Sequence, residues 1–376
     1  MGERSLKVAL VDPVGGHGGM DFYDYGLAYG LAENGVEVVY YTSSQTNVGE
    51  FQNVDTCLCF QDIWNASNKS IKLLNFLLGY LKAFKSAKSQ GIKVVHFQFF
   101  DLGLLNFLVM KMAALFRFEN ILTLHDVSSF KSKQSGKLEK LVLNHFSKII
   151  VHNDLSFQEL KEKTSSDSLI KIIPHGNYLP FVEEIPYQPK SSEPLRLLFF
   201  GQIKKVKGLK LLLRALAAAL KENPNIYLTI AGKPWHEDLK KYGEMIRSPE
   251  LVNNVTAYFD YIPNEEVSNL FKNTDLVVLP YKKIYQSGVL LLAMSYGRVA
   301  LTSNLPAFKE VIEDGVTGLL FKKNNSDSLK DQILYVAQHK HELITMRENA
   351  SDLLKDKFDW KTIGKKTKMI YLSHIN

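Results

Sequence analysis

The chain has 376 residues, of which 45% are hydrophobic and 23% charged, and its formal net charge is +7. This length predicts two domains of about 150 to 200 residues each, and the composition excludes a disordered or collagen-like chain. The sequence shows neither a signal-like segment nor a run of about 18 uncharged apolar residues, which predicts a cytoplasmic protein without a membrane span.

Strands alternate with helices along the first half of the chain. This alternation is typical of a parallel, doubly wound sheet, and we expect a first Rossmann-like domain over residues 1–181. The strands are expected at 6–12, 36–42, 93–98, 120–125 and 148–152, and the helices at 21–35, 71–89 and 103–117.

The pattern lapses over residues 182–194, VEEIPYQPKSSEP, which are polar, contain three prolines and are typical of a linker. A second Rossmann-like domain is expected at 195–355, and the C-terminal helical segment 356–376 is expected to cross back to the first domain. The predicted fold class is therefore α/β, with two doubly wound parallel-sheet domains facing a cleft. The second set of strands is expected at 195–201, 226–232, 255–259, 275–280, 298–303 and 317–321.

Two turns of the second domain have the residues of a diphosphate site. In FFGQIKKVKG, the residues Gly201, Gln202 and Lys207 lie between a strand and a helix. A lysine there can neutralise a diphosphate, although most lysines are solvated surface charges. In YQSGVLLLAMSYG, the N–H groups that follow Ser287 can bind the same anion. The alternative is that Ser287 only caps the helix.

Other polar residues also follow expected strands. The first loop, DPVGGHGGMD, includes Gly16 and either lets a ligand approach the backbone or forms only a tight turn, since it lacks the G-x-G-x-x-G spacing. His125 and Asp126 end a strand, where a histidine can act as acid, base or hydrogen-bond donor. Glu310, expected just inside a helix, can accept sugar hydroxyls or complement the helix dipole.

No metal site is predicted. The histidines do not have a metal-binding spacing, and Cys57 and Cys59 are expected to point to opposite faces of a strand, which disfavours a disulfide or a metal pair.

Residues 69–148 are strongly basic, with 13 Lys/Arg against four Asp/Glu. They include a basic amphipathic helix with Lys82 and Lys85 and a segment with Lys131 and Lys133, which we expect to face an acceptor or an anionic membrane. The alternative is that the apolar face of this helix packs on the sheet. Nucleic acid is a weaker hypothesis, because no recognition motif accompanies the charge.

In this order the motifs resemble family 4 of the glycosyltransferases, which has the GT-B fold, over nearly the whole chain. The matching stretches are the glycine-rich first loop, LAYGLAENGVEVVYYT, TLHD, IIPHGN, FFGQIKKVKG, TIAGKP, TDLVVLPY, GVLLLAMSYGRVALTSNLPAFKEVIEDGVTGLLF and FDW. The sequence departs from the family at three charged positions: the two usual glutamates of E-G-F-G-x-x-x-x-E-A-M are Ile284 and Leu292, and the usual arginine of G-R-L-x-x-x-K-G is Gln202.

The resemblance implies transfer of a sugar, with retention, from a UDP- or GDP-linked donor to a saccharide or lipid-linked saccharide acceptor, without an obligatory metal or cofactor. The second domain would bind the donor and the first the acceptor, at the cytoplasmic side of a membrane. A catalytically inactive sugar-nucleotide-binding partner of another transferase is the alternative. The implied catalytic residues are His125 and Asp126, and the implied donor contacts are Gly16, Gly201, Gln202, Lys207, Tyr285, Gln286, Ser287, Gly288, Val289 and Glu310.

Overall fold

The computed structural model describes residues 6–16, 19–46, 54–61, 63, 68–127, 136–164, 166–183, 185–186, 193–235 and 239–373. It divides into two compact units. Unit 1 comprises Met1–Gly176 and Phe358–Asn376, and unit 2 comprises Asn177–Lys357. Lys131 and Lys133 lie outside the described residues, so their role stays a prediction.

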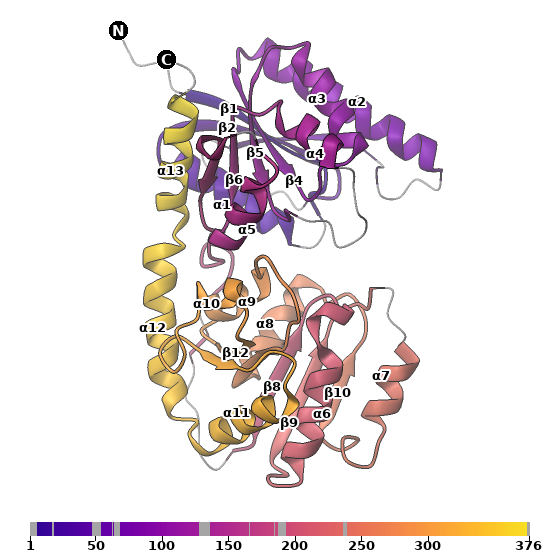
Figure 1. The fold of residues 1–376 in the computed structure, drawn as a ribbon, viewed down its shortest axis with the longest axis vertical. Coiled ribbons are helices and arrows are strands. Elements are labelled where there is room, and N and C mark those ends of the chain that lie inside the picture. The colour runs from indigo at the N-terminus through magenta and orange to yellow at the C-terminus, as the bar shows by residue number, and fades with distance from the viewer. Residues whose placement is uncertain are drawn as a thin grey trace. The chain divides into compact units, whose positions relative to one another are not determined.

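Unit 1 is built on a seven-stranded parallel sheet in the order β3-β2-β1-β4-β5-β6-β7 (Figure 1). The strand order reverses between β1 and β4, so their carboxyl ends are where a doubly wound sheet binds its ligand. The strands are β1 Leu6–Asp12, β2 Val36–Ser43, β3 Val54–Phe60, β4 Val94–Phe99, β5 Glu119–Leu124, β6 Lys148–Val151 and β7 Ile170–Ile172. The α-helices are α1 Met20–Ala32, α2 Lys69–Ser89, α3 Leu104–Ala114, α4 Gly136–Leu143, α5 Asp154–Lys161 and α13 Trp360–Leu372.

The C-terminal helix α13 belongs to unit 1 because it packs closely on α1. A Cβ on Gly364 of α13 would collide with the backbone of Gly30 on α1. The Trp360 side chain, 1% exposed, fills the space that the missing side chains of Gly26 and Gly176 leave. Glycines at these contacts let the two helix backbones approach each other.

Unit 2 is built on a six-stranded parallel sheet in the order β10-β9-β8-β11-β12-β13. Its strands are β8 Leu195–Phe200, β9 Ile226–Ala231, β10 Val255–Tyr258, β11 Leu276–Leu279, β12 Val299–Ser303 and β13 Leu319–Phe321. Its α-helices are α6 Leu209–Leu220, α7 Leu239–Ile246, α8 Asn264–Lys272, α9 Gly288–Ser295, α10 Pro306–Lys309, α11 Ser326–Gln338 and α12 Glu342–Lys357.

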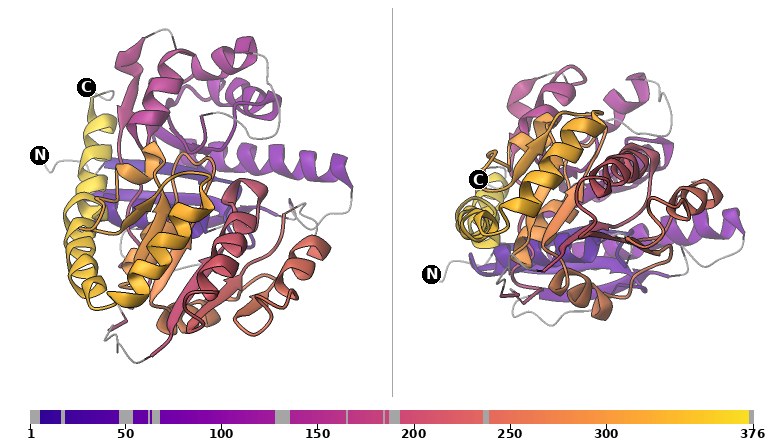
Figure 2. Two further views of the ribbon diagram at one scale, coloured as in Figure 1. Left: turned by 60° about the horizontal axis from the view of Figure 1, so that its bottom comes forward. Right: turned by 90° about the horizontal axis from the view of Figure 1, so that it is seen from below.

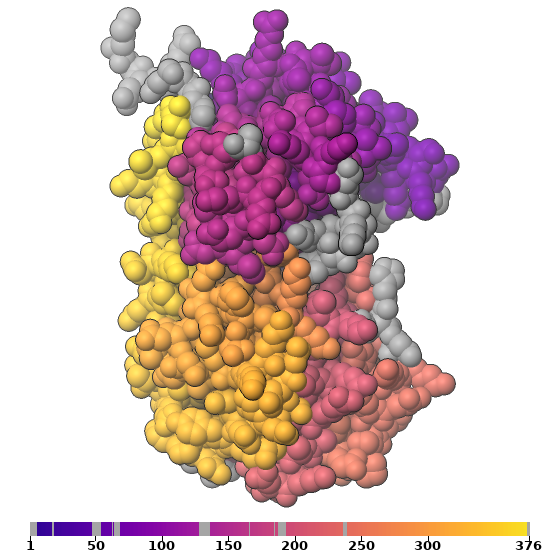
Figure 3. Space-filling view, in the orientation of Figure 1, coloured from indigo at the N-terminus to yellow at the C-terminus, as the bar shows by residue number. Residues whose placement is uncertain are grey.

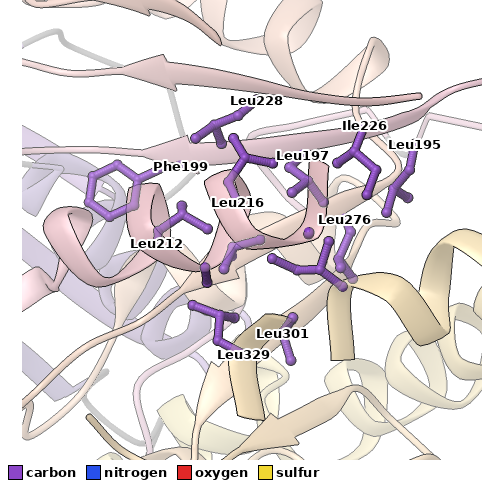
Figure 4. Packing of buried hydrophobic residues seen from close by; sticks show 14 of the residues in the cluster. Leu195, Leu197, Phe199, Leu212, Leu216, Ile226, Leu228, Leu276, Leu301 and Leu329 are labelled. Atoms are coloured by element: carbon purple, nitrogen blue, oxygen red, sulfur yellow. The ribbon is translucent and has the colours of Figure 1, made fainter. Parts of the chain in front are cut away.

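The core of unit 2 forms where α6 and α11 cover the sheet. Leu212 and Leu216, one helical turn apart on α6, pack against Leu197 and Leu228 of adjacent strands (Figure 4). This packing fixes the start of α6, and with it the turn that joins β8 to α6. The predicted fold class, with two Rossmann-like parallel-sheet domains, is confirmed.

The structure corrects the expectation for the two cysteines. Cys57 and Cys59 stand two residues apart in β3, so their side chains share one face of the strand. A hydrogen bond between the two thiols lowers the pKa of Cys57 to about 7. Among the described residues, no group of three or more His, Cys, Asp or Glu side chains is arranged to hold a metal ion. None of the described helices has the length and hydropathy needed to cross a bilayer.

Candidate functional site

The glycine-rich loop after β1 is held by both neighbouring elements. Asp12 accepts a hydrogen bond from the Val14 N–H (2.8 Å), and Asp21 accepts one from the Gly16 N–H (2.7 Å). Gly16 has φ +84°, and a Cβ there would lie 2.5 Å from the carbonyl oxygen of Gln45. Gly16 is therefore required by the packing of the loop on the end of β2, in addition to the ligand approach that we predict.

A pair of buried carboxyl groups lies behind this loop. Asp12 and Asp24 are both fully buried and hydrogen-bonded to each other, and Asp24 also accepts a hydrogen bond from the Tyr40 hydroxyl (2.8 Å). Burial raises the pKa of Asp12 to about 6, and burial together with the Asp12 charge raises the pKa of Asp24 well above its usual value. Asp24 is therefore the protonated partner at neutral pH, and it donates to the Asp12 carboxylate that anchors the loop.

His125 follows β5 at the carboxyl edge of the unit 1 sheet and is buried among aromatic rings. The Phe100 ring stacks on it at 4.8 Å, and the Tyr23 ring meets it edge-on at 4.8 Å. Its Nδ1 lies 3.3 Å from Nε2 of His152, and its Nε2 lies 3.0 Å from the side-chain oxygen of Gln98. Adjacent strands thus supply a partner for each nitrogen of the ring.

The hydrogen bonds determine the tautomers of these histidines. His152 Nδ1 lies 3.0 Å from the carbonyl oxygen of Ile173, which can only accept, so Nδ1 carries the proton and Nε2 is an acceptor. His125 must then donate from Nδ1, which leaves its Nε2 as an acceptor. Turning the Gln98 amide by 180° presents an N–H to that nitrogen, and it also gives a partner to the buried Gln98 nitrogen that otherwise has none.

Burial keeps both histidines neutral. It lowers the pKa of His125 well below its usual value, with a smaller contribution from neighbouring histidines, and it lowers the pKa of His152 to about 3. His125 is therefore neither a proton donor nor an effective base at neutral pH in this state, which narrows its predicted roles to hydrogen bonding. Asp126 is half-buried beside it, and its catalytic role stays a prediction.

In unit 2, three glycines shape the turn between β8 and α6. Gly201, Gly208 and Gly232 all have positive φ angles, of 94°, 74° and 151°. A Cβ on Gly232 would collide with the carbonyl oxygen of Gly201, and one on Gly208 with that of Pro280. These close backbone contacts place the turn against the loop that leads to α9. Gln202 is half-buried in the same turn.

Lys207 points into this turn. A Cβ added to Gly201 would lie 3.3 Å from the Lys207 Nζ. The same Cβ would lie 3.2 Å from the Cγ2 of Val289, at the start of α9. The ammonium also stands over the Tyr281 ring, 5.3 Å from its centre. Burial lowers the pKa of Lys207 to about 8. A desolvated ammonium beside a helix N-terminus is suited to an anionic group.

The start of α9 combines a side-chain cap with a glycine. The Ser287 hydroxyl accepts a hydrogen bond from the Leu290 N–H (3.2 Å), so the capping alternative is correct for the side chain. Capping of Leu290 does not use the N–H groups of Gly288 and Val289, the first residues of the helix. A Cβ on Gly288 would lie 2.6 Å from the Tyr178 hydroxyl, so a larger residue here requires the tyrosine or the helix to move.

Two predicted donor contacts, Tyr285 and Glu310, lie in positions that differ from those expected. Tyr285 is fully buried, with Lys283 Nζ 5.3 Å from its ring centre, so it supports the loop rather than presenting a surface. Glu310 ends the four-residue helix α10 instead of beginning it, so the expectation that it complements an N-terminal dipole is wrong. Gln286 is half-buried between Tyr285 and the cap.

The surroundings of the unit 2 turn are positively charged. The pKa of Lys210 is lowered first by Lys241 and then by Arg214 and Lys282, which shows that these cations crowd one another. Such a cluster favours a polyanionic ligand.

Four residues that orient the predicted ones were not predicted from the sequence. They are His152 and Gln98 around His125, Tyr178 against Gly288, and Tyr281 beneath Lys207. A signal existed for His152 alone, since KIIVH and TLH place a histidine directly after each of two successive strands.

Two parallel-sheet Rossmann-like units in tandem are the architecture of the GT-B glycosyltransferases. Residues 182–352 match the model of the family described as Glycosyl transferases group 1. The matched residues lie within unit 2, and the resemblance of the chain to the glycosyltransferases is confirmed.

The relatives are also glycosyltransferases. An uncharacterized glycosyltransferase of Methanocaldococcus jannaschii is 26% identical over 66% of this chain and 65% of its own length. A GDP-mannose:glycolipid 4-beta-D-mannosyltransferase of Xanthomonas campestris pv. campestris is 28% identical over 39% of this chain and 40% of its own. The chain thus aligns with less than two thirds of either relative. The solved structure of Anabaena HepE in complex with UDP-glucose is 18% identical, with a TM-score of 0.73 and coverage of 98% of this chain and 100% of that one, and it shares the fold.

Proposed function

We propose that the protein transfers a sugar from a UDP- or GDP-linked donor to a hydroxyl group of a saccharide acceptor. The observation that supports this proposal best is the convergence of Lys207, Gly201 and the start of α9 in unit 2. A nucleotide-sugar is a diphosphate ester, and departure of the nucleoside diphosphate develops negative charge on its phosphates. Lys207 and the first N–H groups of α9 neutralise that charge, so the proposed reaction needs no bound metal.

The acceptor in this proposal is a lipid-linked saccharide at the cytoplasmic face of a membrane, in glycan or polysaccharide synthesis. Two observations support it: the basic excess of residues 69–148, and the glycolipid in the name of the Xanthomonas relative. Unit 1 would bind this acceptor near His125 and Asp126. The His125 Nε2 lone pair can accept a hydrogen bond from a sugar hydroxyl if the Gln98 amide moves away from this nitrogen. Transfer would retain the anomeric configuration.

The test is donor binding followed by transfer. Saturating nucleotide-sugar at a hundred times its dissociation constant stabilises a protein by about 2.7 kcal/mol. A thermal-shift screen with UDP, GDP and their sugar conjugates, including UDP-glucuronate, should show a rise for one nucleotide. Lys207→Met should abolish that rise and Lys207→Arg should keep most of it. An equal rise in Lys207→Met would reject the diphosphate assignment.

An inactive partner of another transferase is the second candidate. It is favoured by Ile284 and Leu292, which replace the two glutamates that the resemblance leads one to expect. This candidate predicts donor binding without turnover in the isolated protein. NMR of the product distinguishes the two, since a transferred sugar of retained configuration contradicts inactivity, and the same assay with EDTA tests the independence from metal.

A further inference from the structure

Unit 1 carries exposed apolar side chains on two neighbouring helices. They are between 41% and 60% exposed, although leucine and isoleucine are among the residues most often buried. The set comprises Ile71, Leu73, Leu74 and Leu78 on α2, and Leu104 and Leu105 on α3.

The first half of α2 has no buried residue. The buried positions of this helix begin at Gly79, which packs against the Phe60 ring, and none of residues 69–78 is buried. Figures 1 and 2 show this end of α2 extending beyond the sheet of its unit, and Figure 3 shows it as the purple projection. Packing on the sheet therefore explains the second half of the amphipathic pattern but leaves the first half unexplained.

Both sets of exposed side chains lie toward the carboxyl edge of the sheet. Helix α2 follows β3 and α3 follows β4, so each helix begins at that edge. Near the end of α2, the Nζ of Lys88 donates a hydrogen bond to the carbonyl oxygen of Phe116, just after α3 (3.0 Å). This bond joins the C-terminal ends of the two helices, away from the exposed side chains. The exposed leucines thus share an edge of unit 1 with His125 and Gly16.

The same helices are basic. Residues 68–118 contain eight Lys/Arg against one acid, Asp101. Lys69, Lys82 and Lys85 on α2 and Lys111 on α3 are exposed. Apolar side chains flanked by lysines match the two layers of a membrane interface, in which anionic headgroups lie over acyl chains.

We propose that α2 and α3 dock on an anionic lipid bilayer, with the six apolar side chains of their N-terminal halves entering the boundary between headgroups and acyl chains and the exposed lysines of the two helices contacting the headgroups. A second copy of this chain is a less suitable partner for this surface, because a two-fold contact would place one cationic surface against another. This inference deepens the proposed function, on which its link to a lipid-linked acceptor rests. Docking at this edge presents the region around His125 to a saccharide attached to the membrane.

Vesicle co-sedimentation of the full chain tests the proposal. Wild-type protein should bind vesicles with 30% phosphatidylglycerol at least tenfold more tightly than pure phosphatidylcholine vesicles. Leu74→Ser with Leu105→Ser should weaken binding about tenfold or more, since each leucine loses its apolar burial. Lys82→Glu with Lys85→Glu should weaken it by about fivefold per lysine removed. The matched controls on α13, Met369→Ser with Leu372→Ser and Lys365→Glu with Lys366→Glu, should bind as the wild type does.

Each other outcome overturns the proposal. If Leu74→Ser with Leu105→Ser binds vesicles as tightly as Met369→Ser with Leu372→Ser, or if all binding disappears at 0.5 M salt, the contact is a charge effect without insertion. If lipid-free wild type dimerises and Leu74→Ser with Leu105→Ser is monomeric, a second copy is the occupant. Donor binding to unit 2 is measured on the same variants by thermal shift with nucleotide-sugar, so a failure of vesicle binding is distinguishable from a failure of the proposed function.

Discussion

Nε2 of His152 accepts a hydrogen bond from Nδ1 of His125 at 3.3 Å, and this contact fixes which nitrogen of His125 carries the proton. The His152 Nε2 is an acceptor because the Nδ1 of the same ring carries the proton and donates it to the Ile173 carbonyl oxygen. The two histidines follow β5 and β6, which are adjacent strands. His152 is thus a positioning residue for His125.

Replacing His152 should change the tautomer of His125. In His152→Phe the acceptor is lost, so the His125 proton is no longer fixed on Nδ1, and we expect a shift toward the Nε2–H form in long-range ¹H–¹⁵N spectra. His152→Gln, whose amide oxygen can replace Nε2, should retain the wild-type tautomer. Transfer activity should fall about tenfold or more in the first variant and much less in the second, following the size of general acid–base or hydrogen-bonding effects. Identical His125 spectra in both variants would show that His152 does not set the tautomer.

Donor binding should depend on pH through Lys207. Its pKa of about 8 in the empty protein means that half of the ammonium is deprotonated at pH 8. A bound diphosphate favours the charged form and raises this pKa, so affinity should be full below pH 7 and fall by up to about tenfold per pH unit above 8. Calorimetry at pH 8 in buffers of different ionisation enthalpy should show uptake of a fraction of a proton. Lys207→Arg, which stays charged, serves as the control and should show no uptake.

Gly288→Ala should disturb the start of α9. Its Cβ would lie 2.6 Å from the Tyr178 hydroxyl, so either the tyrosine or the helix must move. We expect donor affinity to fall about tenfold and Tyr178→Phe in the same chain to restore part of it, as a double-mutant cycle would reveal. Gly136→Ala, at the first residue of α4 where a Cβ meets open space, should leave the affinity unchanged. Additive effects of the two substitutions would contradict the contact.

The Asp12–Asp24 pair should lower stability as pH rises. Both pKa values are raised by burial, so the protonated forms are favoured in the folded state. The stabilising contribution is fully present below pH 4, where the unfolded chain is also protonated. As pH rises, the contribution of Asp12 is lost by about pH 6 and that of Asp24 at higher pH, each at up to about 1.4 kcal/mol per pH unit.

Asp24→Asn tests this dependence. The amide keeps a donor toward Asp12 without a titrating proton, so the variant should gain stability relative to wild type between pH 5 and pH 7.5. Thermal midpoints across this range measure the difference. Asp55→Asn, on the exposed part of β3, should follow the wild-type curve, and a parallel curve for Asp24→Asn would mean that Asp24 is not the protonated partner.

Local signals in the sequence were sufficient for the fold. The period of apolar residues separates strands from helices, and turn glycines such as Gly201 and Gly208 mark positions where positive φ angles are needed. The helix cap at Ser287 could also be predicted from the sequence, because a cap depends on residues only three positions apart. The expected placement of Glu310 was wrong. Pro306 is the first residue of the helix and Lys309 the last, so Glu310 caps the carboxyl end of this short helix.

By itself the sequence determined the alternation of strands and helices, the glycine turns and the basic charge of residues 69–148. The tertiary structure decided which distant residues meet: His125 with His152, Asp12 with Asp24, and Gly288 with Tyr178. It also decided that burial removes the charge from His125 and lowers the pKa of Lys207, and that half of α2 stays uncovered. The reason is physical. Backbone conformation follows from neighbours along the chain, whereas burial, protonation and exposure depend on the strand order that brings remote segments together.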